Sequence, residues 1–139
     1  MRVHVNVPYQ INLALQSLLV GDDNKEGHLM SDIIHFTDFV ADKGSKKHIA
    51  YAASKAALAN MTLSFSASLA PRVKVNSIAP ALVLFNVGDS DAYKQKAVKK
   101  SLLEKEGGIA EVISTVDYLL SSHYVTGRTL YLDGGRHLK

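Results

Sequence analysis

The chain has no cysteine, no tryptophan and no long apolar run. Without cysteine it can form neither a disulfide framework nor a thiolate zinc site. Its longest nearly unbroken apolar stretch, residues 78–85, is far shorter than the roughly 20 residues that a membrane-spanning helix needs. Residues 1–6 also lack the charged, apolar and small-residue order of a secretory signal. We therefore expect a cytoplasmic protein with no membrane partner.

An excess of charge of one sign is also missing. The 16 lysines and arginines stand against 13 acidic residues, and the densest basic stretch, residues 94–105, has one aromatic neighbour, Tyr93. Surfaces that bind nucleic acid usually combine a basic stripe with several aromatic side chains. The histidines show neither i, i+4 pairing nor an H-E-x-x-H motif. The sequence thus predicts no nucleic-acid partner and no metal site.

What the chain does contain is an alternation of two hydrophobic periods. Apolar residues at helical spacing predict helices over residues 5–20, 49–69 and 109–122, with some helix within 92–104. Runs of β-branched and aromatic residues predict strands over residues 32–36, 73–78 and 129–132, while residues 37–48 are predicted as a polar loop. Helices between strands indicate right-handed crossovers and a parallel sheet, hence one α/β domain over residues 1–139.

Two side chains near the start of the helix predicted over residues 49–69 indicate acid–base chemistry. Tyr51 and Lys55 are four residues apart, which places the phenol and the ammonium one turn apart on one helix face. An ammonium beside a phenol favours the phenolate, so we expect the tyrosine pKa to fall from about 10 toward neutral pH. Such a pair also arises by chance, so its meaning depends on its surroundings.

The surroundings form an ordered set along the chain. Asp38 follows the first predicted strand, at the carboxyl end where open α/β sheets bind ligands. The strand over residues 73–78 runs into Ala79-Pro80, and Val-Thr-Gly-Arg at 125–128 precedes Leu-Asp-Gly-Gly at 132–135. In this order and spacing the motifs resemble the C-terminal part of the short-chain dehydrogenase/reductase family. The resemblance covers essentially the whole chain and implies part of a doubly wound, Rossmann-like parallel sheet.

The resemblance implies roles for several residues. Tyr51 would be the acid/base, and Lys55 would also hold the nicotinamide ribose. Asn6 is similar to the family's helix asparagine, which orders a water and the lysine, although an asparagine here could instead cap its helix. The segment after the second strand would face the nicotinamide, with alanine where the family usually has glycine. The cofactor-binding residues implied are Tyr51, Lys55, Pro80, Ala81, Leu82 and Val83.

Asp38 stands where the family usually has a catalytic serine, and aspartate at this place resembles the pteridine reductases. This implies NADPH-dependent reduction of dihydropterins, such as dihydromonapterin, and of dihydrofolate. A carboxyl group can bind the amino and N–H edge of a pterin and relay a proton to the ring nitrogen. Leu84 and Phe85 would contact the substrate together with Asp38. The alternatives are that Asp38 is a turn residue, that the enzyme reduces carbonyls, or that the chain is a non-catalytic fragment.

A glycine-rich phosphate-binding loop is missing from the sequence. No G-x-x-x-G-x-G motif occurs, and the resemblance implies that the N-terminal dinucleotide-binding βαβ units are absent. We therefore expect a partial domain that is inactive alone. The resemblance also implies a homodimer or homotetramer for the full-length form, with the helices over residues 5–20 and 49–69 at the interface. Packing inside one chain explains the small residues of the second helix equally well.

Overall fold

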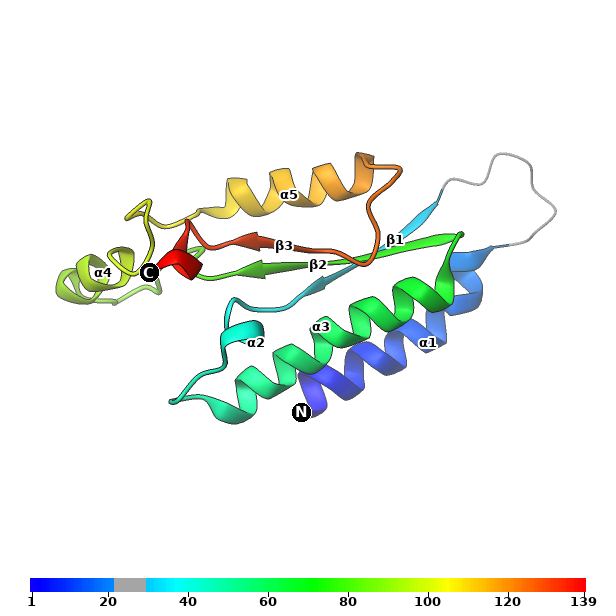
Figure 1. Ribbon diagram of the computed structural model, residues 1–139, viewed down its shortest axis with the longest axis horizontal. Helices are drawn as coiled ribbons and strands as arrows, with labels where there is room; N and C mark the ends of the chain where they lie inside the picture. The colour runs from blue at the N-terminus through cyan, green and yellow to red at the C-terminus, as the bar shows by residue number, and fades with distance from the viewer. Residues whose placement is uncertain (22–29) are drawn as a thin grey trace.

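The computed structural model describes residues 1–21 and 30–139, which form a parallel sheet with helices on both faces (Figure 1). The strands are β1 (Ser31–Phe36), β2 (Val73–Pro80) and β3 (Thr129–Leu132), in the order β1-β2-β3. The helices α1 (Val7–Val20) and α3 (Ile49–Leu69) lie on one side of the sheet, and α5 (Ile109–Ser121) lies on the other. The predicted α/β class with a parallel sheet is confirmed.

Both strand pairs are in parallel register, which brings the three carboxyl ends to one edge of the sheet. Phe36 pairs with Ile78 at the end of β1, and Pro80 pairs with Leu132 at the end of β3. Ligands of open α/β sheets bind outside this edge. The segments that follow β1 and β2 carry Asp38 and Ala81, so both predicted site segments begin at the same edge.

The core lies between β2 and α3. Phe65 and Leu69 of α3 pack on Val73 and Val75 of the central strand, and all four are buried. Residues 73–79 of β2 are all buried, as is typical of a central parallel strand. The long helix ends at Leu69 because Ala70-Pro71 follows, and proline cannot continue a helix.

One charged side chain lies inside this apolar strand. Lys74 is 4% exposed, and its Nζ lies 3.1 Å from Asp32 Oδ1 on β1. The same ammonium donates hydrogen bonds to the carbonyls of Leu119 (2.8 Å) and Ser122 (2.5 Å) at the end of α5. A buried cation needs such partners, and a lysine near a helix C-terminus satisfies carbonyls that have no partner within the helix. Lys74 therefore connects β1, β2 and α5.

Three short segments differ from the sequence predictions. Residues 5 and 6, predicted as the start of the first helix, instead belong to a π-helix, η1 (Arg2–Asn6), that precedes α1. The predicted loop over residues 37–48 contains a helical turn, α2 (Val40–Lys43), whose first N–H bonds Asp38 Oδ1 at 2.9 Å. The helix predicted within 92–104 is the shorter α4 (Asp91–Val98), where the Ser90 side chain caps the first turn. The run Gly-Asp-Asp-Asn at residues 21–24, whose composition predicts a turn after the first helix, lies partly outside the described residues.

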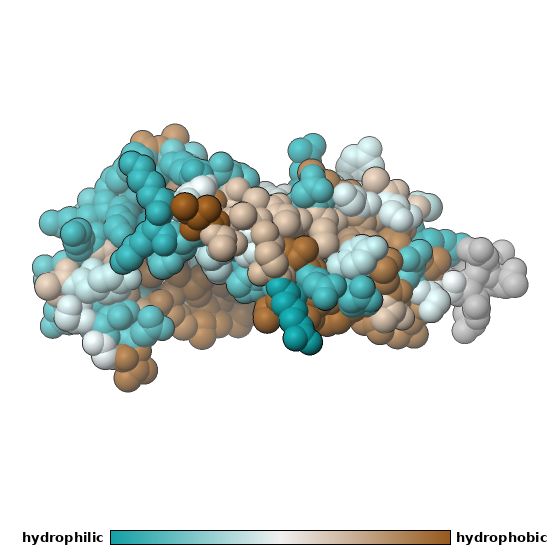
Figure 2. Space-filling model, turned by 90° about the horizontal axis from the view of Figure 1, so that it is seen from below, coloured by the Kyte–Doolittle hydropathy of each residue, from teal (hydrophilic) through white to brown (hydrophobic). Residues whose placement is uncertain are grey.

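Several apolar residues at helical spacing on α5 and α1 are exposed to solvent rather than buried in the core. On α5 only Leu119 is buried, while Ile113 and Leu120 are more than half exposed. On α1 Leu18 is 75% exposed, and contact with the core comes from Leu19 and Val20. Figure 2, which views the side covered by α1 and α3, shows apolar side chains in brown among the polar ones. None of the described helices is long and apolar enough to cross a membrane.

Candidate active site

Tyr51 and Asp38 meet at the carboxyl end of β1. The Tyr51 hydroxyl, in the first turn of α3, donates a hydrogen bond to Asp38 Oδ2 at 2.7 Å. The other carboxylate oxygen of Asp38 accepts the N–H of Val40 at 2.9 Å, which fixes the orientation of the carboxyl group. Two of the residues that the sequence singles out for catalysis therefore meet at the edge of the sheet. Asp38 also makes the turn that the alternative interpretation gave it.

Lys55 lies one turn further along α3. Its Nζ donates a hydrogen bond to the carbonyl of Phe36, the last residue of β1, at 2.7 Å. The ammonium lies 5.9 Å from the centroid of the Tyr51 ring. Lys55 therefore joins α3 to the end of β1 and places a cation beside the phenol ring, without a hydrogen bond to the hydroxyl.

The electrostatics of Tyr51 are opposite to the sequence prediction. Burial, the hydrogen bond to Asp38 and the negative charge of Asp38 raise the pKa of Tyr51 to about 12, in that order of importance. Burial also lowers the pKa of Lys55, against the charge of Asp38, which raises it. The expected fall of the tyrosine pKa is thus wrong for this arrangement, because burial and then a hydrogen bond to a carboxylate from another element both favour the protonated phenol. Tyr51 is protonated at neutral pH.

Asn6, the fourth residue predicted for this site, ends the π-helix η1. Its side chain is exposed and makes no cap hydrogen bond to α1, so it does not cap the helix as the alternative interpretation expected. The hydrogen bonds of the described residues also include none from the Asn6 side chain to Lys55 or Tyr51. Its role in ordering a water near the lysine remains a prediction.

The segment after β2 presents backbone groups at the same edge of the sheet. The N–H of Ala81 bonds the carbonyl of Leu132 at 3.0 Å, which extends the β2–β3 pairing past Pro80. The carbonyls of Leu82 and Val83 accept the N–H groups of Gly107 and Gly108 at 2.9 and 2.8 Å. Among the described residues, the N–H groups of Leu82 and Val83 have no acceptor. Backbone N–H groups are the donors that an amide or other carbonyl ligand needs.

The two residues predicted to contact substrate lie in the continuation of this segment. Leu84 is 51% exposed. The Phe85 ring packs edge-on against Tyr93 of α4, with ring centroids 6.4 Å apart, and Lys94 Nζ lies 6.0 Å from its centroid. Phe85 is therefore packed against α4, whereas Leu84 is available for contact.

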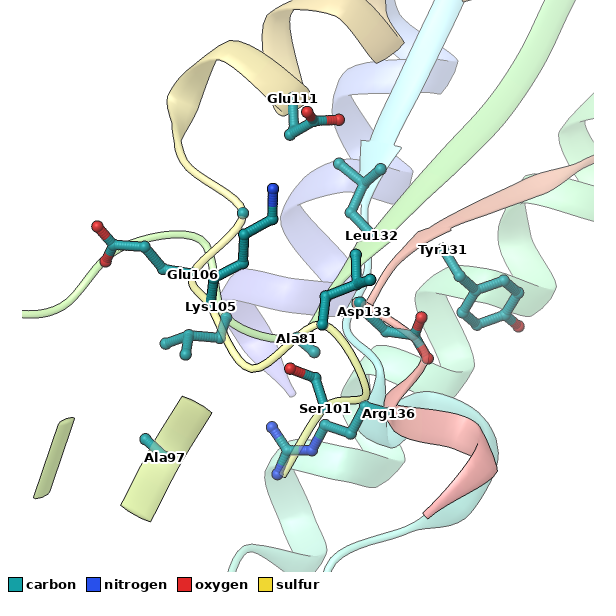
Figure 3. A pocket seen from close by; sticks show the side chains of 14 residues that line it. Ala81, Ala97, Ser101, Lys105, Glu106, Glu111, Tyr131, Leu132, Asp133 and Arg136 are labelled. Atoms are coloured by element: carbon teal, nitrogen blue, oxygen red, sulfur yellow. The ribbon is translucent and has the colours of Figure 1, made fainter. Parts of the chain in front are cut away.

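A cavity of about 250 Å³ adjoins the site (Figure 3). It lies between the segment after β2, the loop after α4 and the carboxyl end of β3. Of the predicted site residues only Ala81 and Leu82 line it, so the hollow is separate from the Tyr51–Asp38 pair. Its other lining includes Ser101, Lys105 and Arg136, which the sequence analysis did not single out because no motif marks them.

Two histidines that the sequence analysis assigned to no site lie close to these elements. His4 of η1 contacts the Tyr51 ring, with ring centroids 5.4 Å apart. His35 of β1 is buried and hydrogen-bonded to Asn12 of α1 and Thr62 of α3, both at 2.9 Å. Burial lowers the pKa of His35, which is therefore neutral at pH 7. No sequence spacing indicates either contact, because each joins elements far apart in the chain.

Comparisons with known proteins relate the chain to a family of reductases. The family model described as enoyl-(acyl carrier protein) reductase matches residues 19–137. A dihydromonapterin reductase from Escherichia coli O6:K15:H31 is 62% identical over the whole of this chain, which covers 56% of that protein. The chain therefore spans about half the length of the curated relatives it matches.

Solved structures share the fold. FolM alternative dihydrofolate reductase 1 from Brucella suis, in complex with NADP, superposes with a TM-score of 0.84 and 28% identity over 99% of this chain and 53% of that chain. A short-chain dehydrogenase/reductase from Burkholderia xenovorans superposes with a TM-score of 0.85 and 26% identity over 99% of this chain and 53% of that chain. The family model and these superpositions cover most of the chain, and on that evidence it belongs to the short-chain dehydrogenase/reductase family.

Proposed function

We propose that this chain carries the proton-transfer half of an NADPH-dependent dihydropterin reductase. The reaction converts dihydromonapterin to tetrahydromonapterin, and dihydrofolate to tetrahydrofolate. The observation that carries the proposal is the 2.7 Å hydrogen bond between Tyr51 and Asp38. Support comes from the 62% identity to a dihydromonapterin reductase and the superposition on a dihydrofolate reductase in complex with NADP.

The residues at this edge fit the nicotinamide end of the cofactor. Lys55 supplies a cation and Tyr51 a hydroxyl for a ribose, while the N–H groups of Leu82 and Val83 have no acceptor among the described residues. Bound NADPH supplies the hydride. The pyrophosphate usually binds a glycine-rich loop at a helix N-terminus, and no such motif is in the sequence. We infer that tight cofactor binding needs chain beyond these residues, and that the 139-residue form alone does not turn over.

The chain's own residues supply the proton. Reduction of a C=N bond adds hydride to carbon and a proton to the neighbouring nitrogen. Tyr51 stays protonated at neutral pH, since its pKa is about 12, and it is therefore able to donate rather than accept. As the proton leaves, the Lys55 ammonium beside the ring stabilises the phenolate. Tyr51 is 39% exposed, so solvent can return the proton.

Asp38 determines the substrate class in this proposal. Its carboxylate is an acceptor for the amino and N–H donors of a pterin, and such charge-assisted hydrogen bonds are short and strong. A carbonyl substrate offers no such donors, and a carboxylate beside its oxygen repels the negative charge that develops there during reduction. The arrangement therefore favours a dihydropterin over a ketone.

Replacing Asp38 tests this assignment. In a protein that carries this chain at its relatives' full length, Asp38→Ser should reduce kcat/KM for dihydromonapterin by at least about fivefold more than for an activated ketone, since a charge-assisted bond exceeds a neutral one by roughly 1 kcal/mol or more. Asp42→Ser is a matched control. The Asp42 carboxylate also accepts a hydrogen bond from a tyrosine hydroxyl, but from that of Tyr131. Equal losses of kcat/KM on both substrates would show that Asp38 does not recognise the pterin.

A further inference from the structure

His4 packs against the ring of the proposed proton donor. The two rings are 5.4 Å apart between centroids and inclined at 82°, which is the edge-to-face arrangement that aromatic pairs prefer. His4 belongs to the π-helix η1, and its side chain is half-buried against α3. Figure 1 shows the N-terminal segment beside α3.

A hydrogen bond fixes the orientation of the His4 ring. Nδ1 lies 3.0 Å from Ser54 Oγ, and Ser54 is 1% exposed. The Ser54 hydroxyl donates its single proton to the carbonyl of Tyr51 at 2.7 Å, so it accepts from His4 Nδ1–H. The chain of bonds therefore runs from the His4 ring through Ser54 to the backbone of Tyr51. The imidazole is tied to the same residue whose ring it contacts.

The two ends of the Tyr51 side chain are thus held from different elements. Asp38, after β1, accepts the hydroxyl, and His4, on η1, packs against the ring. Tyr51 is 39% exposed, so much of its ring has no packing neighbour to restrict its torsions. Without the His4 contact, the Tyr51 ring could rotate and move its hydroxyl away from the position in which it reaches a substrate. Misplacement by about 1 Å at a reacting group can cost roughly a hundredfold in rate.

We propose that His4 is a positioning residue that holds the Tyr51 ring in the orientation for proton donation. The proposal rests on the proposed role of Tyr51. His4 reaches α3 from the π-helical turn that precedes α1, and such turns are frequent at functional sites. His4 acts through the packing of its ring against Tyr51, which the bond to Ser54 helps to orient, and not through transfer of a proton.

Variants of the full-length protein separate these contributions. His4→Ala removes both the ring contact and the bond to Ser54, and should lower kcat at least about tenfold with KM for substrate and NADPH changed less than about twofold. His4→Phe keeps an aromatic ring and should restore kcat to within about threefold of wild type. Val3→Ala, on the same turn and 70% exposed, is the matched control and should leave kcat unchanged.

The pH profile distinguishes positioning from proton relay. If His4 only positions the ring, the kcat–pH profile of His4→Phe keeps the wild-type shape. If His4 relays a proton, His4→Phe should be as impaired as His4→Ala and should lose an ionisation, which would overturn the proposal. Unchanged kcat in His4→Ala would overturn it as well. The ratios can be measured on whichever substrate the wild type reduces, so failure of the pterin assignment would leave this test intact.

Discussion

At the scale of single residues, opposing effects act on the pKa of Tyr51. Sequence spacing places a lysine beside Tyr51, and the structure adds burial and a carboxylate that accepts a hydrogen bond from the phenol. Burial and the carboxylate outweigh the lysine, since the pKa of Tyr51 rises to about 12. The sequence could predict which residues meet here, because strand ends share an edge in a parallel sheet. It could not predict the direction of the pKa shift, because that depends on which partner reaches the hydroxyl.

Removing the phenol hydroxyl should separate proton donation from binding. Tyr51→Phe in the full-length protein should lower kcat by at least about 10²-fold, the scale of general acid catalysis, with KM little changed. Steady-state kinetics with dihydromonapterin measure both constants. A loss below tenfold would assign the proton to another group. Tyr131→Phe is a suitable control, because this tyrosine bonds Asp42, away from Asp38.

His35 should make folding stability depend on pH. Its ring is 6% exposed and bonds Asn12 and Thr62, and burial lowers its pKa below 6.5. The unfolded chain therefore binds the proton more readily, so stability is full above about pH 7 and falls as pH drops below about 6.5, by at most about 1.4 kcal/mol per pH unit. Thermal unfolding at pH 7.5 and 5.5 should show a larger fall in Tm for wild type than for His35→Gln. Equal falls would contradict the assignment.

At the scale of elements, the sequence predicted those bounds of helices and strands that depend only on neighbouring residues. The α3 bounds match the predicted helix to the residue, because an alanine-rich run ends at a proline. The β3 bounds match as well. The π-helix η1 could not be predicted, since five residues do not distinguish its period from that of an α-helix and its shape accompanies the contact of His4 with α3. The exposure of Ile113 and Leu120 also escaped prediction, because the neighbours of a helix decide which of its apolar residues are buried.

Removing Lys74, which connects β1, β2 and α5, should destabilise the fold strongly. Lys74→Met leaves the Asp32 carboxylate, whose side chain is 11% exposed, without its cation. Breaking a buried pair from one side costs about 3–5 kcal/mol, and chemical denaturation measures this loss. Adding Asp32→Asn removes the unpaired charge, so the double variant should be more stable than Lys74→Met alone. A double variant that is less stable would show that the pair is not coupled.

At the scale of the whole molecule, the described sheet has an open side. β1 is an outer strand, and Phe36 at its end is 45% exposed. The neighbouring helix α1 exposes Ile11 and Leu18 by half or more. An unpaired strand edge beside apolar side chains is a surface on which another chain can pair. We therefore expect the 139-residue form to associate with itself as its concentration rises, which analytical ultracentrifugation would detect.

The same chain should bind NADPH only weakly. Lys55, Tyr51 and the free N–H groups of Leu82 and Val83 can hold the nicotinamide end, but the sequence has no glycine-rich loop for the pyrophosphate, which carries much of the cofactor's charge. Losing two or three charge-assisted hydrogen bonds, each about 1.5–3 kcal/mol, weakens binding by at least about 10²-fold. A fluorescence titration of the 139-residue form should not saturate at micromolar NADPH, whereas the full-length protein should. Saturable micromolar binding by the shorter form would mean that its own residues hold the pyrophosphate.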